Sequence, residues 1–170
     1  GVHNLHNALS ATAAAVLLGV PAAAAVKGIE GYTGMAGRGR VWRGRGILLY
    51  DESYNSNPDS AAACLELLRG AGDRGVAVLG DMLELGDHGA QAHRNLIRDA
   101  SAMGLRLVIL VGGALRDAYR GEAGMETVPD AEAALTVLKR EIRPGDRVLV
   151  KGSRSLALDL VVRGIQEEGD

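Results

Sequence analysis

The sequence predicts an α/β fold of the Rossmann-like type, with a mostly parallel sheet that has helices on both faces. Short apolar runs alternate with longer helical segments from Gly46 onward, as in chains built from strand–helix–strand units. Polar or glycine-rich clusters follow several of these runs, and open α/β sheets bind ligands at the carboxyl ends of their strands. The runs expected to form strands are 47–50, 76–79, 107–111, 126–128 and 148–150.

The composition is that of a globular protein and argues against several classes of function. The 170 residues suffice for one core and part of a second domain, and the 47% hydrophobic content argues against disorder. A net charge of −2 provides no electrostatic basis for binding nucleic acid or an anionic membrane. The single cysteine, Cys64, excludes an internal disulfide framework and is expected to be a small buried filler.

Two helices are expected at the start of the chain, over residues 4–18 and from Pro21 onward. The stretch 8–26 is rich in alanine, valine and leucine, but Gly19 and Pro21 interrupt it. It therefore predicts two helices of a cytoplasmic protein rather than a membrane span or a signal peptide. The abrupt start at Gly1 suggests a chain cut from something longer.

Two amides stand close together in the first of these helices. Asn4 and Asn7 lie about one turn apart near its beginning. Their side chains either face one ligand together or serve the helix end and the surface.

Residues 31–46 differ in composition from the segments on either side. Six glycines alternate with four arginines, and the segment holds Trp42, the only tryptophan. We expect a domain linker with a short strand near 40–43. One of its arginines either binds an anion or belongs to a solvated basic surface.

The most polar strand end is the segment 51–58, DESYNSNP, directly after the strand at 47–50. Pro58 suits the first turn of a helix, and Asn57 suits its cap. The preceding side chains either line the ligand crevice or form an ordinary polar loop.

The helices expected between and after these strands are 58–69, 89–103, 114–119, 130–141 and 156–166.

Three other strand ends carry residues that could bind a ligand. Asp81 follows Gly80 and is placed at the crevice. The Gly112–Gly113 pair forms either an anion nest or, as we favour, a tight turn. Residues 151–155, KGSRS, suit a carboxylate or a phosphate unless they only cap the last helix. His88 and His93 have no partner cluster and are expected at the surface.

Several catalytic motifs are absent from the sequence. The chain has no G-x-x-x-x-G-K-[ST] phosphate loop, no G-x-S-x-G nucleophile elbow and no Cys/His cluster of a zinc site. We therefore expect one polar crevice on a Rossmann-like domain, and not a self-sufficient catalyst.

Four segments in order resemble the Mur ligases: GVHNLHNAL at 1–9, DESYNSNP at 51–58, VLGDMLELG at 78–86 and VKGSRS at 150–155. Within that family the resemblance is strongest to the ligases that add D-alanyl-D-alanine. It implies that residues 1–36 are the last helices of a central ATPase domain with its linker. Residues 37–170 would be the Rossmann-like C-terminal domain.

The resemblance also implies a reaction of peptidoglycan precursor synthesis. ATP would phosphorylate the carboxylate of a UDP-N-acetylmuramoyl-tripeptide, and the amine of D-alanyl-D-alanine would attack the acyl phosphate. The implied cofactors are ATP and Mg, with the magnesium ligands in an upstream domain of the same enzyme. The present chain alone is expected to be inactive, and no nucleic-acid or membrane partner is implied.

The resemblance assigns roles residue by residue. Asn4 and Asn7 match positions near the adenine end of ATP, and Arg38 matches an arginine that reaches the ATP phosphates and assists catalysis. Glu52 stands where the family usually has an aspartate that binds the ribose. The nucleotide-facing loop would also contain Tyr54 and Asn55, and the substrate-binding residues would be Lys151, Ser153, Arg154 and, more weakly, Asp81.

Two other interpretations are considered beside the ligase. A stand-alone ligand-binding or interaction module would keep the Rossmann-like scaffold without catalysis. A folylpolyglutamate synthetase-like ligase is the third, and the KGSRS segment at 151–155 argues against it.

Overall fold

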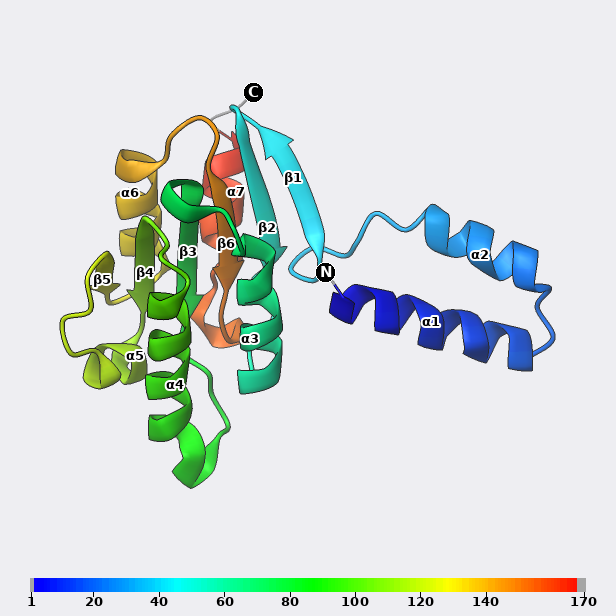
Figure 1. Cartoon of the computed structure of the whole chain (residues 1–170), viewed down its shortest axis with the longest axis horizontal. Helices are drawn as coiled ribbons and strands as arrows, with labels where there is room; N and C mark the ends of the chain where they lie inside the picture. Colours follow the sequence, from blue (N-terminus) through cyan, green and yellow to red (C-terminus); the bar gives the residue numbers. More distant parts are fainter. Residues whose placement is uncertain (1, 168–170) are drawn as a thin grey trace.

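The computed structural model describes residues 2–167, with side chains from residue 5 onward, and within that range it contains one six-stranded sheet (Figure 1). The strand order is β1-β2-β6-β3-β4-β5. β1 pairs antiparallel with β2, and the remaining neighbours pair in parallel, which confirms the predicted sheet. The strands are β1 (Arg40–Gly44), β2 (Ile47–Glu52), β3 (Gly75–Gly80), β4 (Leu107–Val111), β5 (Met125–Val128) and β6 (Arg147–Lys151).

The helices from residue 58 onward lie on both faces of this sheet, also as predicted (Figure 1). Two expected helices are shorter than the sequence suggests. The helix expected at 58–69 gives way to a 3-10 turn at Glu66–Leu68. The helix expected at 156–166 begins only at Asp159, because Ala157 has a left-handed backbone with φ 50°. The helices are α1 (Val2–Leu17), α2 (Ala22–Glu30), α3 (Pro58–Leu65), α4 (Gly89–Ala102), α5 (Gly113–Ala118), α6 (Ala131–Glu141) and α7 (Asp159–Gln166).

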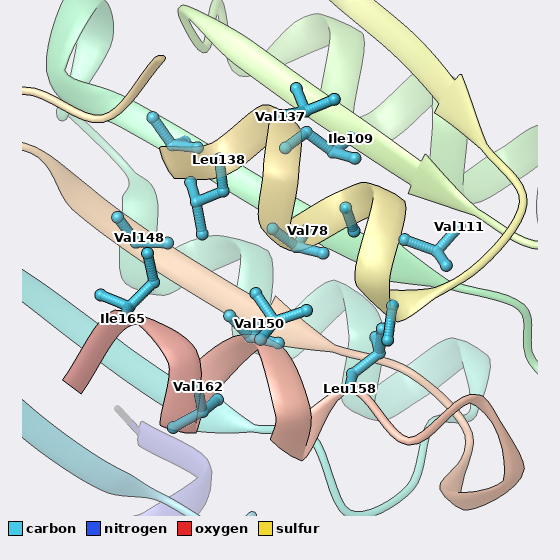
Figure 2. Close-up of a cluster of buried hydrophobic side chains, with 14 of the residues drawn as sticks. Val78, Ile109, Val111, Val137, Leu138, Val148, Val150, Leu158, Val162 and Ile165 are labelled. Atoms are coloured by element: carbon cyan, nitrogen blue, oxygen red, sulfur yellow. The ribbon is translucent and has the colours of Figure 1, made fainter. Parts of the chain in front are cut away.

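The central strands β3, β4 and β6 bury both of their faces, so consecutive side chains enter two different cores. In β6, Val148 and Val150 pack with α6 and α7, whereas Leu149 packs with α3 and α4 on the other face. Figure 2 shows Val148 and Val150 directed toward Ile165 and Val162 of α7. Burial on both faces explains why the strands are continuous apolar runs rather than alternating ones.

A capping box fixes the start of α3, where the sequence predicts a cap. The Asn57 side chain accepts a hydrogen bond from the backbone nitrogen of Ser60 at 2.8 Å, and the Ser60 hydroxyl accepts one from the Asn57 nitrogen at 3.1 Å. Pro58 occupies the first turn. These contacts hold the end of the β2–α3 loop at the carboxyl edge of the sheet.

The two N-terminal helices form a hairpin that projects from the β1–β2 side of the sheet (Figure 1). Gly19, with φ 90°, and Pro21 separate them, as expected. The apolar positions of α1 remain on its surface, where Leu9 is 59% and Leu17 is 87% exposed. None of the helices in the described part of the chain is long and apolar enough to cross a membrane.

Candidate functional site

A cleft of about 1010 Å³ lies between the hairpin, the segment that leads into β1 and the β2–α3 loop. This volume is at the upper end of the range for small-molecule sites. The lining residues that carry polar or charged side chains are Asn7, Tyr32, Thr33, Arg38, Glu52, Tyr54, Asn55, Ser56, Asn57, Ser60, Cys64 and Lys151.

The buried carboxylate of Asp51 fixes the wall of the cleft that carries Arg38. Its Oδ2 atom accepts a hydrogen bond from the Gly37 nitrogen at 2.7 Å, and its Oδ1 atom accepts one from the Ser53 hydroxyl at 2.6 Å. The Gly37 carbonyl in turn accepts a hydrogen bond from the Tyr54 nitrogen at 3.0 Å. The sequence placed Asp51 at this edge but did not reveal that it anchors the linker.

Gly37 is the residue that permits this close approach. Its φ is +77°, and a Cβ atom at this position would lie 2.9 Å from the Cβ of Tyr54. Any other residue would combine a strained backbone with a steric clash. Arg38 follows directly, so its backbone is set by the contacts of Gly37.

The Tyr54 ring lies close to two arginines from different parts of the chain. The guanidinium carbon of Arg38 is 4.2 Å from the ring centroid, and that of Arg154 is 5.6 Å away. Both distances are in the range of cation–π contacts. Arg154 does not line the cleft itself, and this ring connects it to the site.

Glu52 and Lys151 end adjacent strands and are paired in the β2–β6 register. Lys151 is 3% exposed, and its Nζ atom donates a hydrogen bond to the Asn55 carbonyl at 2.9 Å. Burial lowers the pKa of the Lys151 ammonium, while the nearby Cys64 and Glu52 oppose that effect. This cation lies at the floor of the cleft, where an anion would compensate for its lost hydration.

Cys64 of α3 is buried, as expected from the sequence, although it also contributes to the cleft lining. Burial raises the pKa of its thiol to about 11. The neutral thiol is a poor nucleophile and a poor metal ligand. Cys64 therefore shapes the cleft floor rather than reacting there.

Asp81, a candidate substrate-binding residue, makes its hydrogen bonds within the protein. Its carboxylate accepts hydrogen bonds from the backbone nitrogens of Ala114, at 3.0 Å, and Leu115, at 2.8 Å, at the start of α5. A Cβ atom on Gly112 would lie 2.4 Å from this carboxylate. The Gly112–Gly113 turn is therefore occupied by an acidic side chain of the protein itself, in agreement with the favoured tight turn.

Ser153 joins two loops rather than lining the cleft. Its hydroxyl accepts a hydrogen bond from the Leu83 nitrogen at 3.0 Å, and its own nitrogen donates to the Asp81 carbonyl at 3.2 Å. It is 4% exposed. Ser153 thus ties the loop after β3 to the loop after β6.

The prediction that His93 lies at the surface is wrong. Its ring is 3% exposed, and Nε2 accepts a hydrogen bond from the Met82 nitrogen at 2.9 Å. Nδ1 lies 2.7 Å from the Gly89 carbonyl oxygen. When Nδ1 carries the ring proton, it donates a hydrogen bond to this oxygen. His93 lies on the inner face of α4, and its ring faces the loop after β3. His88 is exposed, as predicted.

The structure brings together six of the candidate residues at one cleft: Asn7, Arg38, Glu52, Tyr54, Asn55 and Lys151. Arg154 joins them through Tyr54, whereas Asp81 and Ser153 make internal contacts beside the site. The side chain of Asn4 lies outside the described residues.

The cleft suits the parts of a nucleotide better than a metal ion. Arg38 offers a guanidinium for phosphate, and Glu52 offers a carboxylate for hydroxyl groups. Among the described residues, no group of three His, Cys, Asp or Glu side chains could hold a metal ion.

Comparison with known proteins places this geometry in a family. A UDP-N-acetylmuramoyl-tripeptide–D-alanyl-D-alanine ligase from Synechocystis is 38% identical to the chain, covering 99% of it and 38% of the relative. MurF from Acinetobacter baumannii has a TM-score of 0.83 and 31% identity, covering 98% of this chain and 38% of that one. MurF ligase from Thermotoga maritima in complex with ADP has a TM-score of 0.69 and 25% identity, covering 81% and 32% respectively.

The chain corresponds to only part of the length of these relatives. The chain spans 38% of the length of the Synechocystis relative. Residues 37–154 match the family described as Mur ligase, glutamate ligase domain, and this match includes all of the sheet. The chain belongs to the Mur ligase family.

Proposed function

We propose that the chain is the C-terminal part of an ATP-dependent amide ligase that adds D-alanyl-D-alanine to a UDP-N-acetylmuramoyl-tripeptide in peptidoglycan synthesis. The observation that carries this proposal is the cleft, which unites Arg38, Glu52 and Lys151. The resemblance to a ligase of that name over 99% of the chain supports the choice of substrates. We place the reaction in the bacterial cytoplasm, where ATP is available.

The proposed division of the chain follows its shape. Residues 1–36, which include the projecting hairpin, would belong to the central ATPase domain and its linker. Residues 37–170 would form the C-terminal domain. The remaining parts of the ligase would be the main partner of this chain, and they would hold the phosphate loop and the Mg ligands.

The nucleotide side of the cleft would be built from residues on both sides of the linker. Asn7, with Asn4 one turn earlier, would face the adenine, and Glu52 would bind the ribose hydroxyls. Tyr54 and Asn55 would complete this wall. Arg38 would stabilise the charge on the phosphates while the phosphoryl group moves to the tripeptide carboxylate.

The other side of the cleft would receive the dipeptide. Lys151 donates one hydrogen bond to the Asn55 carbonyl, and its ammonium would bind the dipeptide carboxylate with its remaining N–H donors. Arg154 would offer a second cation. Asp81 and Ser153 would serve the substrate by holding the loops after β3 and β6 together.

Two substitutions in the full-length ligase test these roles. Arg38→Ala should slow acyl-phosphate formation by about 100-fold, the size typical of removing one transition-state donor. Lys151→Ala should mainly raise the KM for D-alanyl-D-alanine, because it removes binding rather than chemistry. Arg116→Ala, on the exposed side of α5, is the control.

The outcomes separate the ligase from the alternative of a stand-alone binding module. The reverse pattern of kinetic effects would contradict the assignments of Arg38 and Lys151. Robust ligation by the 170-residue chain alone would contradict its role as one part of the enzyme. ATP binding by this chain with no contribution to ligation would favour the stand-alone module.

A further inference from the structure

Three segments that are distant in the sequence meet at the ring of Tyr54. Arg38 comes from the segment before β1, Tyr54 from the β2–α3 loop, and Arg154 from the loop after β6. We propose that Tyr54 is a positioning residue that holds both arginines and thereby links the nucleotide side of the cleft to the dipeptide side. This inference rests on the proposed function.

The ring is itself held in a defined place. The Tyr54 nitrogen donates to the Gly37 carbonyl, and the Gly37 nitrogen donates to the buried carboxylate of Asp51. The ring is 41% exposed, so it can present its surface to side chains from outside the core. A fixed backbone with an accessible ring is what a shared support for two cations requires.

The arginines need such a support because both lie at the surface. An exposed arginine samples many rotamers, and it loses that freedom when it binds a ligand. Stacking on the Tyr54 ring restricts Arg38 and Arg154 before any ligand arrives. Because the two side chains are already restricted in the free protein, they lose less conformational entropy when a ligand binds, and binding is stronger.

The closest competing explanation is that Tyr54 is only a wall of the nucleotide site. A wall would affect ATP and leave the dipeptide unchanged. A shared support would affect both ligands when the ring is removed, while each arginine alone would affect only one. This difference makes the two explanations separable by experiment.

The first experiment measures the Kd of a non-hydrolysable ATP analogue and the KM of D-alanyl-D-alanine in the full-length ligase. Tyr54→Leu should weaken both by about 2- to 5-fold, the effect of losing an exposed cation–π contact. Arg38→Ala should weaken only the nucleotide, and Arg154→Ala only the dipeptide. Tyr54→Phe keeps the ring and should recover most of the loss.

The second experiment observes the stack without using the activity. In the 15N-labelled 170-residue chain, the Nε–H signals of Arg38 and Arg154 should be shifted by the ring current of Tyr54. Tyr54→Leu should remove both shifts, and Tyr54→Phe should retain them. Arg116, an exposed arginine of α5, should show no change in any variant.

Each result supports or overturns the inference. Signals of Arg38 and Arg154 that are unaffected by Tyr54→Leu would show that the stack is absent. If Tyr54→Leu removes the stack but changes the affinity for only one ligand, Tyr54 only lines the site and does not link its two sides. The proposed function would stand in both cases if Arg38→Ala still slows acyl-phosphate formation. If Arg38→Ala has no effect on the nucleotide, the proposed function fails and this inference fails with it.

Discussion

The carboxylate of Asp51 accepts a hydrogen bond from the backbone nitrogen of Gly37 at 2.7 Å, across 14 residues of sequence. Asp51 is 5% exposed at the end of β2, whereas Gly37 belongs to the segment that leads into β1. A charged acceptor in a buried place makes a stronger hydrogen bond than a neutral one. The position of Arg38 beside the cleft is therefore set by the sheet edge and not by the linker alone.

Replacing Asp51 should release this segment. Asp51→Ala leaves the Gly37 nitrogen and the Ser53 hydroxyl without their acceptor, and we expect a loss of about 1–3 kcal/mol in the free energy of unfolding. Urea unfolding of the 170-residue chain measures it. Asp73→Ala, at an exposed turn before β3, is the control and should change stability by less than about 0.5 kcal/mol. Equal effects of the two substitutions would contradict the anchoring role.

A second prediction separates backbone strain from contact at Gly37. Gly37 and Gly70 have similar φ values, +77° and +72°, but only Gly37 has an atom within 4 Å of an added Cβ. Gly70→Ala should cost about 1–2 kcal/mol for the left-handed backbone alone. Gly37→Ala should cost clearly more, because the new Cβ would lie 2.9 Å from that of Tyr54.

Urea unfolding and the Nε–H signal of Arg38 measure the two consequences of Gly37→Ala. The signal should move in Gly37→Ala and stay unchanged in Gly70→Ala. Equal stability losses with an unchanged Arg38 signal would mean that the linker adjusts freely and that Tyr54 does not restrain it.

The sequence was sufficient where local chemistry decides the structure. The apolar runs that became β2 and β6 and the cap at Asn57 depend on neighbours within a few residues, so their prediction needed no tertiary information. The same holds for the break between α1 and α2 at Gly19 and Pro21.

Long-range contacts explain what the sequence did not show. Asp81 bonds to the start of α5, which lies 33–34 residues later, and that partner turns a candidate ligand-binding carboxylate into an internal one. His93 is buried because of the loop at Met82, 11 residues earlier. The approach of Arg154 to Tyr54 depends on which strands become neighbours. The family resemblance named six residues that line the cleft, but it could not predict these partners.

Asp81 provides a third prediction, for stability rather than binding. Asp81→Ala removes a buried acceptor from two backbone nitrogens of α5, and we expect a loss of about 3 kcal/mol in the free energy of unfolding. The matched control is Asp130→Ala, because Asp130 caps α6 in the same way but is exposed. Its loss should be about 1 kcal/mol.

Urea unfolding compares the two variants, and ligase kinetics provides the counter-test. An Asp81→Ala variant that is as stable as the wild type but has a strongly raised KM for the dipeptide would contradict a purely structural role. That result would return Asp81 to the role that the sequence suggested.

The buried thiol of Cys64 makes stability depend on alkaline pH. Its pKa is about 11 in the folded chain and 9.0 as an ordinary thiol, so the unfolded state loses its proton first. The thiol therefore makes its full contribution to the free energy of unfolding below pH 9. That contribution is lost as the pH rises from 9 to 11. Two pKa units correspond to about 2–3 kcal/mol.

Lys151 acts in the opposite direction, because burial lowers its pKa and a rise in pH relieves the cost of its charge. Comparing the wild type with Cys64→Ala keeps Lys151 in both proteins, so the difference between them comes from the thiol and its charge interaction with Lys151. The difference in unfolding free energy between them should be constant from pH 7 to 8.5 and should shrink by about 2 kcal/mol by pH 11. Urea unfolding at each pH measures this difference. Parallel curves over the whole range would show that Cys64 titrates as an ordinary thiol, and that the cleft floor is open to water.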